Sequence, residues 1–338
     1  MSTTERSRRS LARRSLAGLL AVGALALAGC ATPLPTPEPD PVPAVPPPTL
    51  TTEQVRAVLD DVAERLEKAD DALDADVLEG RVTGPALTIR SAEFTVNEAL
   101  EDDVDLISVP TSPRTIVVPT TDVWPRSVFV VTEQPEDLQS PRLLVLTQDE
   151  PRAPYELWTW SRLLPDRQVP RTFVPEVGSV PVALDAEGLL MTPAEVGEAY
   201  ADVLDKGSKS DFAKVFGEDP LRERIALVRK QYEKIAEQAG GKFTERYEPA
   251  TEEAVAVSTA DGGAIVVVPM KTTTKITTDD RELSFGKAEA ALLGKKKVTE
   301  SATFTWTGVV AFVIPPEGGA EEIVVLAAEH VRTAVKGK

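Results

Sequence analysis

Two segments of the chain begin with the same helix-starting signal, and this repetition constrains the fold more than any other feature. Thr51 is followed three residues later by Gln54, and Thr192 is followed three residues later by Glu195. In this capping box, the threonine side chain and the third helical side chain each satisfy a backbone N–H of the other residue. Apolar residues at helical spacing follow both signals. The sequence therefore predicts two units that each open with a helix.

Runs of valine, isoleucine and threonine follow each predicted helix and are separated by proline, aspartate and serine. Such runs are typical of β-strands. In the first unit we expect strands at 86–96, 114–118, 127–132, 142–147 and 155–163. In the second unit we expect strands at 242–247, 254–258, 264–276, 302–314 and 322–335. A further helix is expected to begin at Asp219 and to stop at Gly240, and Gly262 and Gly263 predict a tight hairpin.

Helices that come first and strands that follow, with short connections, favour an α+β fold with antiparallel sheets. We expect two tandem domains, at 51–190 and 191–338. Each is expected to pack its helices on one face of a curved antiparallel sheet. The order of elements is similar to that of the cystatin/NTF2-like cone. This likeness concerns the fold and carries no activity with it.

The first 29 residues indicate an export signal rather than a part of the fold. Five arginines precede an uncharged apolar stretch from Leu16, which is shorter than the roughly 20 residues of a lasting transmembrane helix. The stretch ends in Leu27, Ala28, Gly29 and Cys30, a pattern that looks like a bacterial lipobox. Cys30 would then carry a diacylglyceryl lipid, with palmitate as the typical acyl group. The alternatives are an ordinary secretory signal and a short transmembrane anchor, and either Sec or twin-arginine export fits the arginine pairs.

Residues 30–50 combine the proposed lipid acceptor with nine prolines. Proline fixes φ and lacks an N–H donor, so this segment is unsuited to a sheet or a helix. In the polyproline II conformation it would be a spacer of up to about 60 Å. The alternative is a ligand for a proline-recognising groove.

The composition excludes several functional classes. One cysteine allows no internal disulfide, thiolate zinc site or iron–sulfur cluster, and one histidine allows no multi-histidine metal site. A formal net charge of −17 argues against nucleic-acid binding, because phosphate contacts require a basic surface. We therefore expect no metal, no cofactor and no nucleic-acid partner.

The sequence contains no recognisable catalytic constellation. It has no Gly-x-Ser-x-Gly nucleophile elbow, and its many paired carboxylates are expected to be solvated. His330 lies in the last predicted strand, where it is either a general base or, as we expect, a histidine with a structural role. We assign no catalytic residue.

Aromatic residues mark two places where a ligand pocket could form. Trp158 and Trp160 stand two apart on a predicted strand and are expected to face the same side, as a stacking platform or as core. Phe304, Trp306 and Phe312 also alternate onto one face, which we expect to meet the helices of the second domain. In cone-shaped folds, a cavity lies on that side of the sheet.

Several motifs accompany the lipobox and the proline-rich segment. They are Gly84-Pro85-Ala86-Leu87 leading to Arg90-Ser91-Ala92-Glu93-Phe94, Trp124-Pro125-Arg126 ahead of 128–132, and 143–148 leading to Tyr155-Glu156-Leu157-Trp158. With these motifs the whole chain resembles an uncharacterised family of actinobacterial membrane lipoproteins. The resemblance implies a place in the cell envelope, and it transfers no site residue because the family has no assigned activity.

We therefore predict a lipoprotein held at the extracytoplasmic face of the cell membrane, with a non-catalytic binding or scaffolding role. Its expected partners are the membrane and an envelope protein or glycan. The first alternative is an enzyme on an NTF2-like fold that acts on a small hydrophobic or glycan substrate. The second alternative is a solute-binding component of a transporter.

Overall fold

The computed structural model describes residues 46–100, 106–135, 139–279 and 281–338. The predicted lipobox residues and most of the proline-rich segment lie outside the described residues. Within the described part, no helix is both long enough and apolar enough to cross a bilayer.

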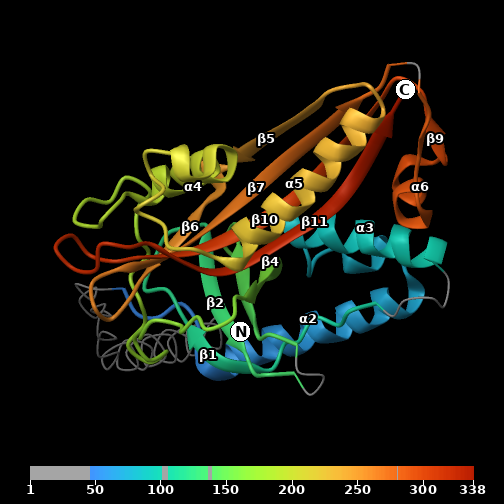
Figure 1. The fold of residues 1–338 in the computed structure, drawn as a ribbon. Helices are drawn as coiled ribbons and strands as arrows, with labels where there is room; N and C mark the ends of the chain where they lie inside the picture. Colours follow the sequence, from blue (N-terminus) through green and yellow to red (C-terminus); the bar gives the residue numbers. More distant parts are fainter. Residues whose placement is uncertain (1–45, 101–105, 136–138, 280) are drawn as a thin grey trace, which may run out of the picture. The chain divides into compact units, whose positions relative to one another are not determined.

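The first helix, α2 (Thr52–Ala72), confirms the predicted capping box (Figure 1). The backbone N–H of Gln54 donates to Thr51 Oγ1 at 3.2 Å, and the N–H of Thr51 donates to Gln54 Oε1 at 2.8 Å. A short 3₁₀ turn, η1 (Ala75–Leu78), follows α2. The helix buries one apolar stripe with steps of three and four residues: Val55, Leu59, Val62, Leu66 and Ala69.

The predicted strand at 86–96 is wrong, because this segment belongs to the helix α3 (Gly84–Leu100). Its isoleucine, leucine and threonine residues are typical of a strand. In the structure, however, side chains three and four residues apart contact each other, as they do on one face of a helix. Arg90 forms an ion pair with Glu93 at 2.8 Å, and its guanidinium lies 5.6 Å from the ring of Phe94. Pro85 lies in the first turn of the helix, where backbone N–H groups have no intrahelical acceptor, so the missing N–H of proline costs no helical hydrogen bond.

Four antiparallel strands follow: β1 (Pro113–Val117), β2 (Arg126–Thr132), β3 (Arg142–Gln148) and β4 (Glu156–Leu163). All four match predicted strands, and their ends differ by one residue at most. Helices α2 and α3 cover the outer face of these strands, where their apolar side chains form one cluster.

The second half begins with α4 (Pro193–Lys206), η3 (Gly207–Lys209) and α5 (Pro220–Gln238). Both expected helix starts are present. Thr192 N–H donates to Glu195 Oε2 at 3.3 Å, and Asp219 Oδ1 accepts from the N–H of Arg222 at 2.8 Å. Gly240 takes a φ of +67° directly after the last turn of α5, which ends the helix where its sequence predicts.

Longer strands complete the second half, and all of the predicted strands are present. In chain order the elements are β5 (Phe243–Pro249), η4 (Thr251–Glu253), β6 (Val255–Ser258), β7 (Ala264–Thr277), β8 (Leu283–Ser284), α6 (Lys287–Leu293), β9 (Lys297–Val298), β10 (Ser301–Ile314) and β11 (Val324–Gly337). Strands β6 and β7 form the hairpin expected at Gly262 and Gly263.

Nine of the strands, from both halves, belong to one sheet, and β8 and β9 pair with each other in a separate two-stranded sheet. The order of the nine-stranded sheet is β1-β2-β3-β4-β11-β10-β7-β5, and β6 pairs with part of β7. The join is a short antiparallel ladder in which Leu163 pairs with Ala327 and Arg162 with Ala328. The described residues form one compact unit. The α+β class is confirmed, whereas two separate tandem cones are not.

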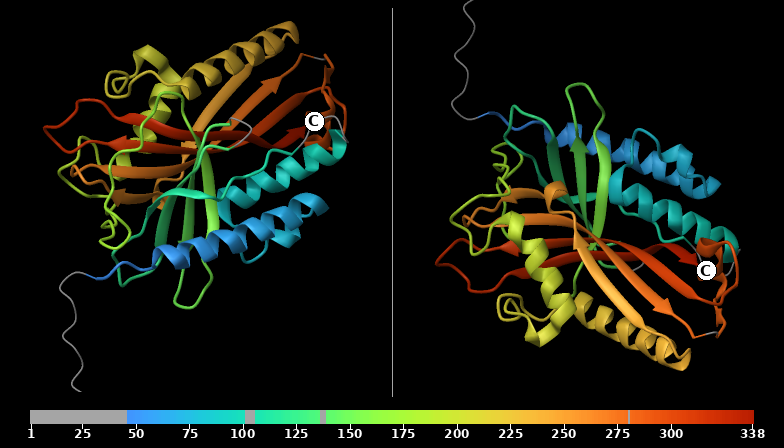
Figure 2. Two further views of the ribbon diagram at one scale, coloured as in Figure 1. Left: turned by 90° about the horizontal axis from the view of Figure 1, so that it is seen from below. Right: turned by 90° about the horizontal axis from the view of Figure 1, so that it is seen from above.

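The sheet bends so that the inner faces of its two halves pack on each other (Figure 2). Helices α2 and α3 cover one outer face, and α4 and α5 cover the other. The inner cluster includes Val117, Phe129, Val131, Leu143 and Val145 from the first half and Ile265, Val267, Val309, Ala311, Leu326 and Ala327 from the second half. The described chain is therefore layered as helix, sheet, sheet and helix.

Beyond Ala328, β11 keeps β10 on one side but pairs with no strand of the described chain on the other. Helices α3 and α6 contact β11 and each other along this free edge. The edge therefore faces helices from both halves of the chain.

We expect Gly84→Ala to destabilise the fold by about 2–4 kcal/mol. Gly84 has a φ of +56°, and a Cβ there would lie 2.5 Å from Trp158 Cδ1. A left-handed conformation costs about 1–2 kcal/mol, and forced overpacking costs about 1–3 kcal/mol. Urea unfolding measures the difference. The matched control is Gly80→Ala, because Gly80 has a φ of +75° but open space around it, and we expect a loss of about 1 kcal/mol there. Equal losses in both variants would show that the Trp158 contact contributes nothing.

Candidate ligand-binding site

The two tryptophans of β4 do not form a shared platform. The pairing of β3 with β4 slips by one residue at Trp158, between the pairs made by Leu157 and Thr159. Such a bulge changes which face the following side chains occupy. Trp160 belongs to the cluster beneath α2 and α3, whereas Trp158 packs against the inner cluster between the halves of the sheet.

Phe312 is fully buried in the core beneath α4. Its ring centroid lies 5.3 Å from that of Tyr200 and 6.0 Å from that of Phe216, in edge-on contacts. Such aromatic contacts stabilise a packed core. Phe312 therefore lines none of the cavities described below.

Phe304 and Trp306 lie where the sheet is less completely covered, beneath α5. They line a cavity of about 380 Å³ between α5, β8 and β10, which we call the α5 cavity. Trp306 also lines a second cavity of about 350 Å³ at the free edge of β11, which we call the edge cavity. The walls of the edge cavity come from α3 and β4 of the first half and from α5, α6, β10 and β11 of the second half.

The single histidine lies in the edge cavity. The ring of His330 stacks on Trp306, with centroids 4.9 Å apart and planes 5° apart, and its Nε2 lies 3.4 Å from Thr272 Oγ1. Burial, assisted by the charge of Arg224, lowers the pKa of His330 to about 4. The imidazole is therefore neutral near pH 7. Its polar partner in the described chain is a hydroxyl, so it lacks the carboxylate that orients a histidine in a catalytic triad.

Glu329, the neighbour of His330 in β11, is buried between two arginines. Its carboxylate lies 3.5 Å from Arg142 Nη1 and 3.6 Å from Arg162 Nη1. Burial raises the pKa of Glu329, and the two guanidinium groups act in the opposite direction. These arginines come from β3 and β4, so the ion pairs connect the two halves of the sheet beside their short joining ladder.

Arg90 of α3 supports the opposite wall of the cavity. Its guanidinium is buried and donates to Asp70 Oδ1 at 2.9 Å, to Glu93 Oε2 at 2.8 Å and to the carbonyl oxygen of Ile107 at 2.8 Å. Glu93 and Ile107 both line the edge cavity. One buried cation thus fixes two wall residues and is shared between the carboxylates of Asp70 and Glu93.

Arg332 separates the edge cavity from the α5 cavity, because it lines both. Its Nη2 lies 2.6 Å from Glu289 Oε1, and its Nη1 donates to the hydroxyl of Tyr232 at 3.1 Å. Its Nε is buried and has no acceptor among the described residues. The guanidinium is thus anchored by α5 and α6, but its Nε–H has no partner in the described chain.

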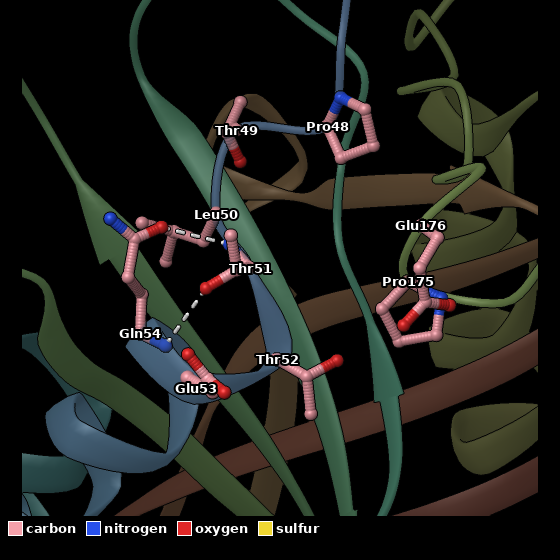
Figure 3. A pocket seen from close by; sticks show the side chains of 9 residues that line it. All are labelled: Pro48, Thr49, Leu50, Thr51, Thr52, Glu53, Gln54, Pro175 and Glu176. Atoms are coloured by element: carbon pink, nitrogen blue, oxygen red, sulfur yellow. Dashed lines mark hydrogen bonds between the residues drawn. The ribbon is translucent and has the colours of Figure 1, made fainter.

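Another depression, of about 420 Å³, lies where the described chain begins (Figure 3). It is lined by residues 48–54 together with Pro175 and Glu176. The side chains of Thr51 and Gln54 are already hydrogen-bonded to the backbone of the helix start, as the dashed lines in Figure 3 show. These two side chains therefore serve the fold, and the edge cavity, which gathers charged side chains from both halves, is the better candidate site.

Comparison with known protein families identifies the family of the chain. A family model described as "domain of unknown function (DUF8094)" matches residues 46–337. The chain belongs to this family. No curated protein and no solved structure matches it. Membership in DUF8094 agrees with the expected resemblance to an uncharacterised family, and the lipoprotein character stays a prediction.

Among the residues that line the edge cavity, Trp306 and His330 could be singled out from the sequence, whereas the charged groups could not. Glu329 lies within an apolar strand, and a charge in such a run indicates a buried partner. The partners, Arg142 and Arg162, lie far away in the sequence, so no local pattern could have indicated them.

We expect His330→Gln to reduce the acid sensitivity of the fold. The folded pKa of His330, about 4, lies below its unfolded value of 6.5. The unfolded chain therefore binds the proton first, and stability that is fully present above pH 6.5 is lost as the pH falls towards 4. This loss is about 2–3 kcal/mol in the wild type and is absent from the variant. Denaturant unfolding at pH 7, 6, 5 and 4.5 measures it.

The matched control for this titration is Thr272→Val, which removes the hydroxyl partner but leaves the imidazole in place. It should retain the wild-type pH dependence. An unchanged pH profile in His330→Gln would contradict the low pKa.

Proposed function

We propose that this protein is a lipid-anchored binding protein of the extracytoplasmic membrane face, which holds a small ligand in the edge cavity without transforming it. The observation that carries the proposal is the character of that cavity. It combines an apolar wall with arginines, while its histidine is neutral near pH 7 and contacts a hydroxyl rather than a carboxylate.

The dimensions and position of the cavity support binding. Its volume of about 350 Å³ falls in the usual range of ligand pockets, about 300–1,000 Å³. It lies between elements of both halves, and ligand sites often occur at such junctions. Its charged wall residues Glu93 and Glu329 are held by ion pairs, which keeps the pocket largely pre-formed.

The sequence around Cys30 supports the anchor. Leu27, Ala28 and Gly29 supply the aliphatic and small residues expected before a lipidated cysteine. Each buried acyl CH₂ contributes about 0.8 kcal/mol to membrane binding, and two chains anchor stably where one does not. The proline-rich segment would then separate the cavity from the bilayer.

An enzyme that acts on a small hydrophobic substrate is the second candidate, because His330 lies in the same cavity beside Trp306. A general base is most effective when its pKa is near the working pH. The pKa of about 4 makes His330 a weak base at neutral pH, which favours binding over catalysis.

We expect the full chain, expressed in bacteria that are fed an alkyne-labelled fatty acid, to incorporate the label and to sediment with membranes. Cys30→Ala should lose the label completely and move to the aqueous fraction, because Cys30 is the only cysteine. In-gel fluorescence after click chemistry measures the label. Thr32→Ala, two residues further on, should behave as the wild type. Persistent labelling of Cys30→Ala would rule out this anchor.

We expect the full-length protein, purified in mild detergent, to retain a small molecule that organic extraction and mass spectrometry recover. Val96→Phe should lose most of this molecule, because Val96 lines the edge cavity and a larger ring would occupy it. The control is Leu227→Phe, at an α5 position that is 62% exposed and outside the lining. Recovery of a chemically altered molecule after incubation with the protein would instead favour the enzyme.

A further inference from the structure

We propose that the edge cavity takes an amphipathic anion, an apolar body that carries one carboxylate, with the carboxylate held by Arg224 and Arg332. This inference rests on the binding role proposed above and names the ligand class. It follows from the charges that remain after the ion pairs among the described residues around the cavity are assigned.

Both carboxylates that line the edge cavity already contact arginines of the described chain. Glu93 pairs with Arg90 at 2.8 Å. Glu329 lies 3.5 Å from Arg142 and 3.6 Å from Arg162. A cationic ligand would therefore have to displace an existing arginine from one of these carboxylates.

Arg224 supplies a cation that no carboxylate of the described residues contacts directly. It lines the cavity from α5 and has no ion pair or hydrogen bond among the described residues. The residues three and four positions away on the helix are Pro220, Leu221, Leu227 and Val228, and none of them can neutralise it. Its charge reaches the interior of the site, because it helps to lower the pKa of both Glu329 and His330.

Arg332 supplies a donor without an acceptor. Its Nη groups contact Glu289 and Tyr232, but its Nε is buried and unpaired in the described chain. An unsatisfied buried donor is unfavourable, and such atoms in a native fold call for an explanation. A carboxylate oxygen in the cavity would accept from this N–H and would also neutralise Arg224.

The remaining wall suits an apolar body. Val96 of α3, Leu292 of α6 and Val331 of β11 line the cavity together with the ring of Trp306. Ile107, at 42% exposure, adds an apolar side chain that is left open to solvent. Burial of apolar ligand surface contributes about 25 cal/mol per Å², so these side chains favour an acyl or aromatic body over a glycan.

Isothermal titration with three ten-carbon probes tests the proposal: decanoate, 1-decanol and decylamine. The full-length chain with Cys30→Ser is used, because it lacks the lipid acceptor. We expect decanoate to bind at least about tenfold more tightly than the alcohol or the amine, as a charge-assisted hydrogen bond predicts. Arg224→Gln should weaken decanoate binding about tenfold and leave decanol binding unchanged.

Two further variants serve as controls. Arg56→Gln removes another exposed helical arginine without a partner, on α2 and outside the cavity lining, and should not change binding. Val96→Phe should weaken decanoate and decanol alike. Because all variants share the apolar leader, binding of a probe to the leader cannot produce a difference between Arg224→Gln and Arg56→Gln.

Equal affinities for decanoate and decanol, or an Arg224→Gln variant that binds decanoate as the wild type does, would overturn the anion assignment. If Val96→Phe still weakened both probes in that case, the binding role of the cavity would stand. Failure of decanoate to bind also overturns the anion assignment. The binding role itself then depends on whether extraction of the wild-type protein yields a ligand that Val96→Phe lacks.

Discussion

Apolar burial between the two inner faces of the bent sheet is the interaction on which the described fold depends. The ladder that joins the halves pairs only Leu163 with Ala327 and Arg162 with Ala328. So short a ladder adds little to stability. The inner cluster, with contributions from strands on both sides, holds one half against the other. Because neither inner face could be left in water, the two halves behave as one folded unit even though each opens with its own helix.

The buried charges at the junction add a geometric constraint. Glu329 lies between Arg142 and Arg162, and removing one partner from a buried pair is typically destabilising by about 3–5 kcal/mol. Such a group favours the one alignment of β4 and β11 that satisfies it. The same ion pairs hold one wall of the edge cavity, so the requirements of the fold and of the site coincide at this strand.

The sequence predicts those parts of the fold that depend on local interactions. Helix starts at Thr51, Thr192 and Asp219 and most strands could be predicted, because caps and alternation act over a few residues. The segment of α3 is wrongly predicted as a strand, because its β-branched residues are typical of strands and the contacts that favour the helix involve α2. The union of the halves and the ion pair of Arg142 with Glu329, 187 residues apart, depend on long-range pairing that no local pattern encodes.

The free edge of β11 has a consequence for the energetics of the whole described chain. The walls beside it come from helix α3 in the first half and from α5 and α6 in the second half. A molecule bound in the edge cavity would contact both halves at once and would connect them. Since it would bind only the assembled arrangement, occupancy raises the free energy of separating the halves by an amount that grows with the logarithm of its concentration. A protein with a ligand in the edge cavity would then resist heat and proteases better than the empty protein.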